Sequence, residues 1–385
     1  MCFEAPTGEQ EFFVTVSSAK RRILLFQDRL RIGGTERQTL FLARWLQNAG
    51  HTVGVLVTEP GGELWDQLCE AGHQVLSLQQ RSYGLPLLAP GLFRTVRAWQ
   101  PDTILAMGRT ANCYAGILQR AFPGVCVVGS VRTGKQLFPL HRWSLRHVRR
   151  IIVNSYWWKA RLLSEGFPPE QVEVVRNALA LEGIRANGEA PETGDGRHLR
   201  REFGVDPNAC VFLSVAGFRR GKRQIDLLHL FSEARRSCVA PPMVLWLVGE
   251  GPMRARCERV ARRLGLRDAV RFSGYRADPL PFYAAADVAV SASREDALPN
   301  FLVEAQASGL PFVAFDCAGV KECGQPGQSC VILDRSDDPG FINALSTFAG
   351  TPEMRREFGE AGRIYAAKEF DPVRQARLFE SVLLR

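Results

Sequence analysis

The chain has 385 residues, is 46% hydrophobic and carries a formal net charge of +9. This length exceeds one comfortable core and predicts two domains of ordinary size. No stretch approaches 18 uncharged apolar residues and the N-terminus has no apolar signal core, so we expect neither a membrane span nor an export signal. The ten cysteines include no Cys-x-x-Cys pair, which fits reduced thiols in a cytosolic protein.

The positive charge is concentrated in the first half. Through residue 190 there are 22 Lys+Arg against 15 Asp+Glu, and the remainder has 27 against 25. A basic half in a soluble protein predicts an anionic partner, which could be a nucleic acid, a phosphorylated substrate or an anionic membrane surface. Composition does not choose among these partners.

The first elements alternate between strand and helix. A buried-strand pattern at 22–26 precedes a polar loop with two glycines, and helical periodicity follows over 35–49. The next strand pattern covers 51–57, which completes a βαβ unit. Further apolar runs lie at 74–78, 103–106, 125–128 and 151–153. The first half therefore predicts a parallel sheet covered by helices.

A second sheet is expected after residues 182–200, where the chain loses apolar character and collects Gly, Pro and charge, as linkers do. Strand patterns follow at 211–215, 244–248, 270–272, 288–290, 312–315 and 330–333, with helices between them. Two doubly wound α/β domains result. Since ligands sit beyond the carboxyl ends of parallel strands, both halves are expected to face one interdomain cleft.

The predicted order of domains runs as follows. Residues 1–20 are an extension outside the folded domains, with disorder as one interpretation; 21–181 form a Rossmann-like domain; 182–200 are the linker; 201–370 form a second Rossmann-like domain; and 371–385 are a helix expected to pack on the first domain.

Two glycine turns are candidate phosphate or sugar sites. Gly33 and Gly34 open the first helix, where glycine lets a ligand approach the backbone, although the absence of a G-x-G-x-x-G pattern leaves a simple turn as the alternative. The second turn begins at Gly217 and gathers Arg219, Arg220, Lys222 and Arg223 after a strand. Forked arginine contacts and a lysine point charge suit a diphosphate; a solvated basic loop is the alternative.

The segment 293–311 places two carboxylates, Asp296 and Glu304, around the start of a short apolar helix. Pro299 and Asn300 stand where that helix begins, and Gly309 ends it. Free amides and the positive end of the helix dipole attract a diphosphate, while the carboxylates can take sugar hydroxyls. An ordinary acidic loop before a core helix is the alternative.

These segments occur in a characteristic order. Before 293–311 come Gly-Gly-Thr-Glu (33–36), Gly-His (50–51), Val-Asn-Ser (153–155), Arg-Asn (176–177), Gly-Phe-Arg-Arg-Gly-Lys (217–222), Gly-Glu-Gly-Pro (249–252), Phe-Ser-Gly-Tyr (272–275) and Ala-Asp-Val (286–288). Over residues 20 to 370 the chain resembles the group 1 glycosyltransferases, which are retaining, sugar-nucleotide-dependent enzymes with the GT-B fold. The first domain would then be the acceptor side and the second the donor-binding side.

The resemblance implies roles for particular residues. Glu304 would hold the ribose hydroxyls of the nucleotide, Asp296 the hydroxyls of the donor sugar, and Lys222 with Arg219 or Arg220 the diphosphate. The catalytic set that the resemblance implies is Arg219, Arg220, Lys222 and Asp296, and Glu36 and Arg132 are assigned to the acceptor side. The amides of 300–302 would contact the diphosphate. The full donor-binding set is Gly33, Gly34, Gly217, Gly249, Tyr275, Pro299, Asn300, Phe301, Leu302 and Glu304.

The sequence departs from the family at two positions. Asp296 stands where Glu is more frequent, which shortens the reach by one methylene and bears on donor choice. Arg132 lies in the stretch where many relatives carry a histidine near the reacting carbon. None of the six histidines is assigned to the site.

The expected reaction transfers a sugar from a nucleoside diphosphate donor to a glycan or lipid-linked acceptor in cell-surface polysaccharide synthesis, with retention at the anomeric carbon. Cationic side chains and helix amides would stabilise the leaving diphosphate without a metal or another cofactor, since no Asp-x-Asp motif follows a strand. The alternatives are a sugar-nucleotide epimerase or glycan phosphorylase of the same fold, and an inactive sugar-nucleotide-binding module. No nucleic acid partner is expected.

The segment 140–150 adds a possible membrane contact to this prediction. On a helical projection Arg142, Arg146, Arg149 and Arg150 share one arc of about 100°, a pattern that can lie on an anionic bilayer. A buried helix with a solvated basic face is the alternative. The expected location is the cytoplasm, with peripheral attachment to the inner face of the membrane as the further prediction.

Overall fold

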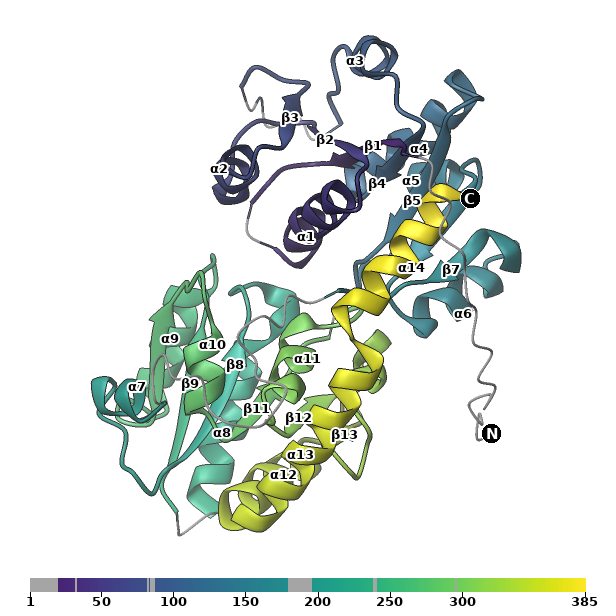
Figure 1. Cartoon of the computed structure of the whole chain (residues 1–385). Coiled ribbons are helices and arrows are strands. Elements are labelled where there is room, and N and C mark those ends of the chain that lie inside the picture. The colour runs from purple at the N-terminus through teal and green to yellow at the C-terminus, as the bar shows by residue number, and fades with distance from the viewer. Residues whose placement is uncertain are drawn as a thin grey trace.

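The computed structural model describes residues 20–31, 33–81, 83, 87–178, 196–237, 241–294 and 296–385. They form two α/β domains, each built on one parallel sheet, and Figure 1 shows the domains one above the other. This architecture confirms the predicted fold class of two doubly wound Rossmann-like domains.

The first sheet has the strand order β3-β2-β1-β4-β5-β6-β7, with every pair parallel. Its strands are β1 (Arg22–Gln27), β2 (Thr52–Val57), β3 (Gln74–Ser77), β4 (Thr103–Ala106), β5 (Cys126–Val131), β6 (Arg150–Val153) and β7 (Val172–Val174). The first six were predicted, with ends that differ by up to three residues. The short edge strand β7 was not.

Helices cover both faces of this sheet. Ile23 and Leu25 of β1 are buried against α1 and α2, while Leu24 and Phe26 point to the other face, toward α3 to α6. The bounds are α1 (Gly34–Asn48), α2 (Glu63–Glu70), α3 (Leu92–Trp99), α4 (Arg109–Ala121), α5 (Pro139–Leu145), α6 (Tyr156–Ser164) and the 3-10 turn η1 (Pro169–Gln171).

The second sheet has the order β10-β9-β8-β11-β12-β13, again parallel throughout. Its strands, all of which were predicted, are β8 (Cys210–Val215), β9 (Met243–Val248), β10 (Val270–Gly274), β11 (Val288–Ser291), β12 (Phe312–Phe315) and β13 (Cys330–Leu333). One face is covered by α8 (Gln224–Ser237), α9 (Arg254–Arg263) and α12 (Asp338–Gly350), and the other by α7 (Gly196–Glu202), α10 (Leu280–Ala285) and α11 (Asn300–Ala307). The 3-10 turns η2 (Arg220–Lys222) and η3 (Ala318–Glu322) and the helix α13 (Pro352–Glu369) complete this domain.

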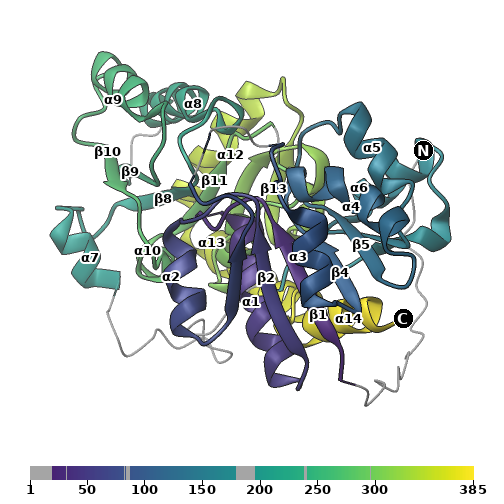
Figure 2. The same cartoon turned by 90° about the horizontal axis from the view of Figure 1, so that it is seen from above.

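The last helix, α14 (Pro372–Leu384), returns to the first domain and lies beside α1 (Figures 1 and 2). Phe379 and Leu383 are buried in the same core as α1, and Trp45 Nε1 donates to Glu380 Oε2 at 3.1 Å. The Asp371 side chain begins the helix by accepting a hydrogen bond from the Arg374 amide. This helix therefore ties the two domains together.

The predicted extension, 1–20, apart from its last residue, and most of the predicted linker, 182–200, lie outside the described residues. From Gly196 onward the chain is already helical. Arg200 of α7 holds this helix on the second domain, because its Nε donates to Ala285 O at 2.7 Å and its Nη2 pairs with Asp287 at 2.6 Å. The second domain thus begins earlier than predicted.

The prediction of one basic helical face over 140–150 is wrong. The helix α5 ends at Leu145, and Arg150 already belongs to β6, because the chain must turn to enter the sheet. The four arginines also have partners within the protein: Arg142 pairs with Glu165 at 3.2 Å, and Arg146, Arg149 and Arg150 donate to the carbonyls of Glu165, Pro123 and Val382 at 2.9, 2.9 and 3.0 Å.

Candidate functional site

Three loops meet at the carboxyl end of the second sheet, after β8, β9 and β10. The Phe218 amide donates to Glu250 O at 2.9 Å, and the Gly249 amide donates to Gly274 O at 2.8 Å. Gly249 has a φ of +143°, and a Cβ there would lie 2.2 Å from Ala216 O. Glycine is therefore required for this close backbone approach, which brings the turn at Gly217 against the next loop.

A fourth loop, after β11, contacts the cationic turn. The Arg294 amide donates to Gly221 O at 3.0 Å, and Lys222 Nζ lies 2.5 Å from Asp296 Oδ1. Both side chains are half-buried, with 30% and 15% of their surfaces exposed. The structure thus brings together two residues that are 74 positions apart and that the sequence assigned to the diphosphate and the donor sugar.

The helix α11 carries the second predicted carboxylate. Glu304 Oε2 accepts a hydrogen bond from the hydroxyl of Tyr283 on α10 at 2.6 Å. Burial raises the pKa of Glu304, which Tyr283 and Arg37 partly oppose. Tyr283 was not singled out from the sequence, because its link to Glu304 depends on how α10 and α11 pack.

The start of α11 offers fewer amides than expected. Pro299 precedes the helix in an extended conformation, but the Leu302 amide donates to Pro299 O at 3.0 Å, so this amide has an acceptor within the turn. That it meets the diphosphate stays a prediction, and this amide would have to leave its acceptor to do so. The amides of Asn300 and Phe301 have no hydrogen-bond acceptor in the described part of the chain.

The glycine turn of the first domain faces α11. Gly33 is extended, with a φ of −169°, and a Cβ on Gly34 would lie 3.2 Å from Asn300 Nδ2. The carboxylate of Glu36 lies over Gly33. Burial raises the pKa of Glu36 to about 7; Asp28 adds to this rise and Arg219, across the interdomain boundary, opposes it.

Arg132 follows β5 and belongs to a chain of hydrogen bonds between the domains. Its Nη2 donates to Asn177 Oδ1, and Asn177 Nδ2 donates to Asn300 Oδ1. The guanidinium also lies over the ring of Phe379 on α14, 5.2 Å from its centroid, and burial lowers its pKa to about 9. Arg132 therefore reaches the start of α11 through Asn177, which the sequence flagged only as part of an Arg-Asn motif.

The remaining candidates lie at the rim. Arg219, Arg220 and Tyr275 are exposed, and Tyr275, directly after β10, has 42% of its surface accessible. The Gly217 carbonyl accepts from Gln224 Nε2 at 3.1 Å, which fixes the turn to the start of α8. Phe301 is partly buried against the core that contains α11.

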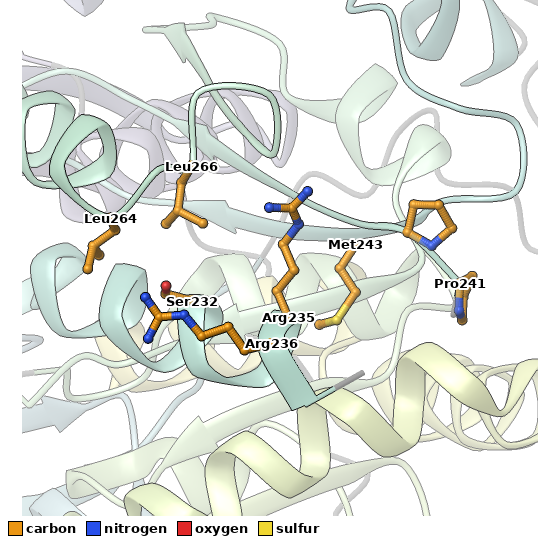
Figure 3. A pocket seen from close by; sticks show the side chains of 8 residues that line it. Ser232, Arg235, Arg236, Pro241, Met243, Leu264 and Leu266 are labelled. Carbon is orange, nitrogen blue, oxygen red and sulfur yellow. The ribbon is translucent and has the colours of Figure 1, made fainter. Parts of the chain in front are cut away.

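Figure 3 shows a pocket of about 340 Å³ that lies elsewhere. Arg235 and Arg236 come from the last turn of α8, and Met243 begins β9. The pocket is therefore at the amino end of β9, at the opposite edge of the sheet from Lys222 and Asp296. Among its described lining residues there is no paired acid and base.

The described residues lack a membrane-spanning helix and a metal site. None of their helices is long and apolar enough to cross a membrane. They also contain no group of three His, Cys, Asp or Glu side chains placed to hold a metal ion.

Comparisons with known proteins agree with this architecture. Residues 32–182 match the model of glycosyltransferase family 4, and residues 209–350 match that of the glycosyl transferases group 1. The lipopolysaccharide core biosynthesis glycosyltransferase LpsE of Rhizobium meliloti is 31% identical over 335 residues, which are 86% of this chain and 89% of the relative. LpsD of the same organism is 25% identical over 332 residues, 86% of this chain and 89% of its own.

The fold is also that of solved structures. The Anabaena protein HepE, crystallised with UDP, superposes with a TM-score of 0.79 at 21% identity, covering 94% of this chain and 99% of its own. The two matched domains, the similarity to LpsE over 86% of the chain and the paired parallel sheets lead to one conclusion: the chain belongs to the group 1 glycosyltransferases and has the GT-B fold.

Proposed function

We propose that this glycosyltransferase moves a sugar from a nucleoside diphosphate donor to a glycan or lipid-linked acceptor in cell-surface polysaccharide synthesis. The observation that carries the proposal is the meeting of Lys222, Asp296 and the Glu304 helix at the carboxyl end of the second sheet. The relatives support it, since LpsE and LpsD are lipopolysaccharide core biosynthesis glycosyltransferases and HepE was crystallised with UDP.

In this proposal the donor lies over the start of α11. Glu304, positioned by Tyr283, accepts the ribose hydroxyls, and the amides of Asn300 and Phe301 meet the diphosphate together with Lys222 and an arginine of the 219–220 pair. Asp296, now paired with Lys222, accepts hydroxyls of the donor sugar.

The reaction then needs electrostatic stabilisation rather than a protein nucleophile. Negative charge develops on the leaving diphosphate, and preorganised cations and amides lower the barrier without a metal. Attack of the acceptor hydroxyl on the face that the diphosphate leaves retains the anomeric configuration, and the departing phosphate oxygen takes the proton. Glu36 and Arg132, on the first domain, border the acceptor, and Gly33 and Gly34 lie on the donor side.

The location we propose is cytoplasmic, with peripheral membrane attachment as a separate hypothesis. The internal partners of Arg142, Arg146, Arg149 and Arg150 weaken that hypothesis, although Leu140 and Trp143 on α5 remain 41% and 36% exposed. Flotation of the protein with anionic and neutral vesicles tests it, and equal distribution between the two would contradict it.

A panel of UDP-, GDP- and ADP-sugars, with binding followed by calorimetry and transfer by released diphosphate, tests the main proposal. We expect one donor to bind and to be turned over with and without EDTA. Binding without turnover of any acceptor would favour the inactive module, and conversion of the donor to an epimer or use of inorganic phosphate would favour the epimerase or phosphorylase. If no donor binds, the proposed function fails.

A further inference from the structure

A second basic pocket adjoins the cationic turn. It has a volume of about 380 Å³ and lies between the starts of α8 and α9. Asp226 is the one carboxylate among its described lining residues. Five arginines line it: Arg219, Arg220, Arg223, Arg256 and Arg294.

The charges of this pocket are poorly compensated. Asp226 pairs with Arg223, whose Nη1 is nevertheless buried without a hydrogen-bond partner in the described part of the chain. The guanidinium groups of the other four arginines make no ion pair or hydrogen bond with any described residue. Neighbouring cations without partners repel one another. An anion that binds here is attracted by every arginine and reduces this repulsion.

Backbone groups add to this attraction. Gln224, Ile225 and Asp226 line the pocket and form the first turn of the 14-residue helix α8. Amides of a first helical turn have no acceptor within the helix and lie at the positive end of its dipole. Forked arginines around free amides match the oxygens of a phosphate group.

The pocket adjoins the site assigned to the donor and shares the 219–220 pair with it, but most of its lining lies on other elements. Helices α8 and α9 cover one face of the second sheet and α10 covers the other (Figure 2). Helix α11 packs in the same core as α10, where Glu304 meets Tyr283. The turn 219–223 lies between the two sites. Arg219 belongs to the pocket and also influences the Glu36 carboxyl group of the first domain, so the pocket borders the acceptor side.

We infer that this arginine pocket binds a phosphate group carried by the acceptor, beside the diphosphate site of the donor. The inference rests on the proposed function, because only a transferase has an acceptor. The volume exceeds that of one phosphate and leaves room for part of the sugar that bears it. The acceptor class it names is a phosphorylated glycan.

The test uses the full chain with its donor site saturated by the nucleoside diphosphate that the donor panel selects. Titration with inorganic pyrophosphate should then show a further binding event by calorimetry. Arg256→Gln should weaken this event by about tenfold, since it removes one forked charged contact, and should leave nucleotide affinity unchanged. Arg262→Gln is the matched control, because Arg262 is exposed on the same helix and does not line the pocket.

The possible outcomes separate the hypotheses. Glucose 1-phosphate that competes with pyrophosphate supports a glycan phosphate, whereas competition by phosphatidate vesicles alone overturns it in favour of a lipid headgroup. Equal pyrophosphate affinity in the wild type and Arg256→Gln, or no second event, also overturns it. If no nucleotide binds, the proposed function fails, but the pocket can still be tested in the free chain. The pyrophosphate affinities of Arg256→Gln and Lys222→Ala are then compared, so that binding in the pocket is told apart from binding at the diphosphate site.

Discussion

Lys222 and Asp296 form an ion pair with 2.5 Å between Nζ and Oδ1, which joins the loops after β8 and β11. A donor that uses both residues must replace this contact by contacts of its own. The pair therefore keeps each charge half-buried and neutralised until the donor arrives. Its geometry also depends on side-chain length, because the single methylene of Asp296 sets how far its carboxylate reaches toward Lys222.

The first prediction concerns donor choice. Asp296→Glu lengthens the side chain by one methylene, so we expect the order of donor sugars ranked by kcat/KM to change while the preferred nucleotide stays the same. Asp296→Asn keeps the length, removes the charge and should lower kcat/KM for every sugar. Both variants are assayed across the same panel. An unchanged ranking for Asp296→Glu would contradict the assignment of Asp296 to the donor sugar.

The second prediction concerns the diphosphate and the ribose. Lys222→Ala and Glu304→Ala should each lower turnover by at least about tenfold, or about 1.4 kcal/mol of transition-state stabilisation. Lys321→Ala is the control, because Lys321 also pairs with an aspartate, Asp316 at 2.8 Å, but is 63% exposed and lies on η3. Initial rates at saturating donor measure the turnover of each variant. Wild-type turnover in both variants would remove these residues from the site.

The third prediction treats Tyr283 as a positioning residue for Glu304. Donor hydroxyls bind best to an ionised Glu304, so affinity should fall as the pH drops through its raised pKa. Tyr283→Phe removes the hydrogen bond that lowers this pKa, and the fall should therefore begin at higher pH. Calorimetric Kd values measured across pH test this shift. A uniform loss of affinity at every pH would point to a packing role alone.

Much of the fold follows from local patterns in the sequence. Short apolar runs between glycine turns marked every strand of the second sheet and all but β7 of the first. The strand β7, Val-Glu-Val at the sheet edge, is too short for a periodic pattern to reveal. The predicted basic helical face over 140–150 was wrong for a related reason. A helical projection assumes a continuous helix, but the chain turns into β6 after Leu145.

Local patterns in the sequence predicted only part of the candidate site. Motifs whose residues lie close together in the sequence, such as Gly33 with Gly34 or Asp296 with Glu304, carry a local signal. Asn177 meets Asn300 from 123 positions away, and Tyr283 reaches Glu304 from another helix. Such partners depend on how the domains and helices pack, which no spacing in the sequence encodes.

The fourth prediction uses the pKa of Glu36, which burial raises from its ordinary value of 4.5 to about 7. The folded state holds this proton more tightly than the unfolded state, so its stabilising contribution is complete below pH 4.5 and is lost as the pH rises to about 7. Glu36→Gln avoids that loss and should melt above the wild type at pH 8, with a difference that shrinks toward pH 4.5.

Melting curves at several pH values, with Glu63→Gln as the control, provide the measurement. Glu63 also lies in the first turn of a helix, α2, but it is exposed. A melting difference for Glu36→Gln that does not vary with pH would show that the carboxyl group keeps its ordinary pKa.

The fifth prediction tests the backbone contact that holds the donor-side loops. Gly249→Ala places a methyl group 2.2 Å from Ala216 O at a φ of +143°, so the loops after β8 and β9 must separate. We expect a loss of at least about 2 kcal/mol in the free energy of unfolding, together with weaker donor binding. Gly265→Ala is the control, because Gly265 also has a positive φ, +71°, but open space around it, and should cost only about 1 kcal/mol without affecting the donor. Denaturant unfolding and calorimetry measure both effects, and equal losses in the two variants would show that the conformation of glycine, not the loop contact, sets the requirement.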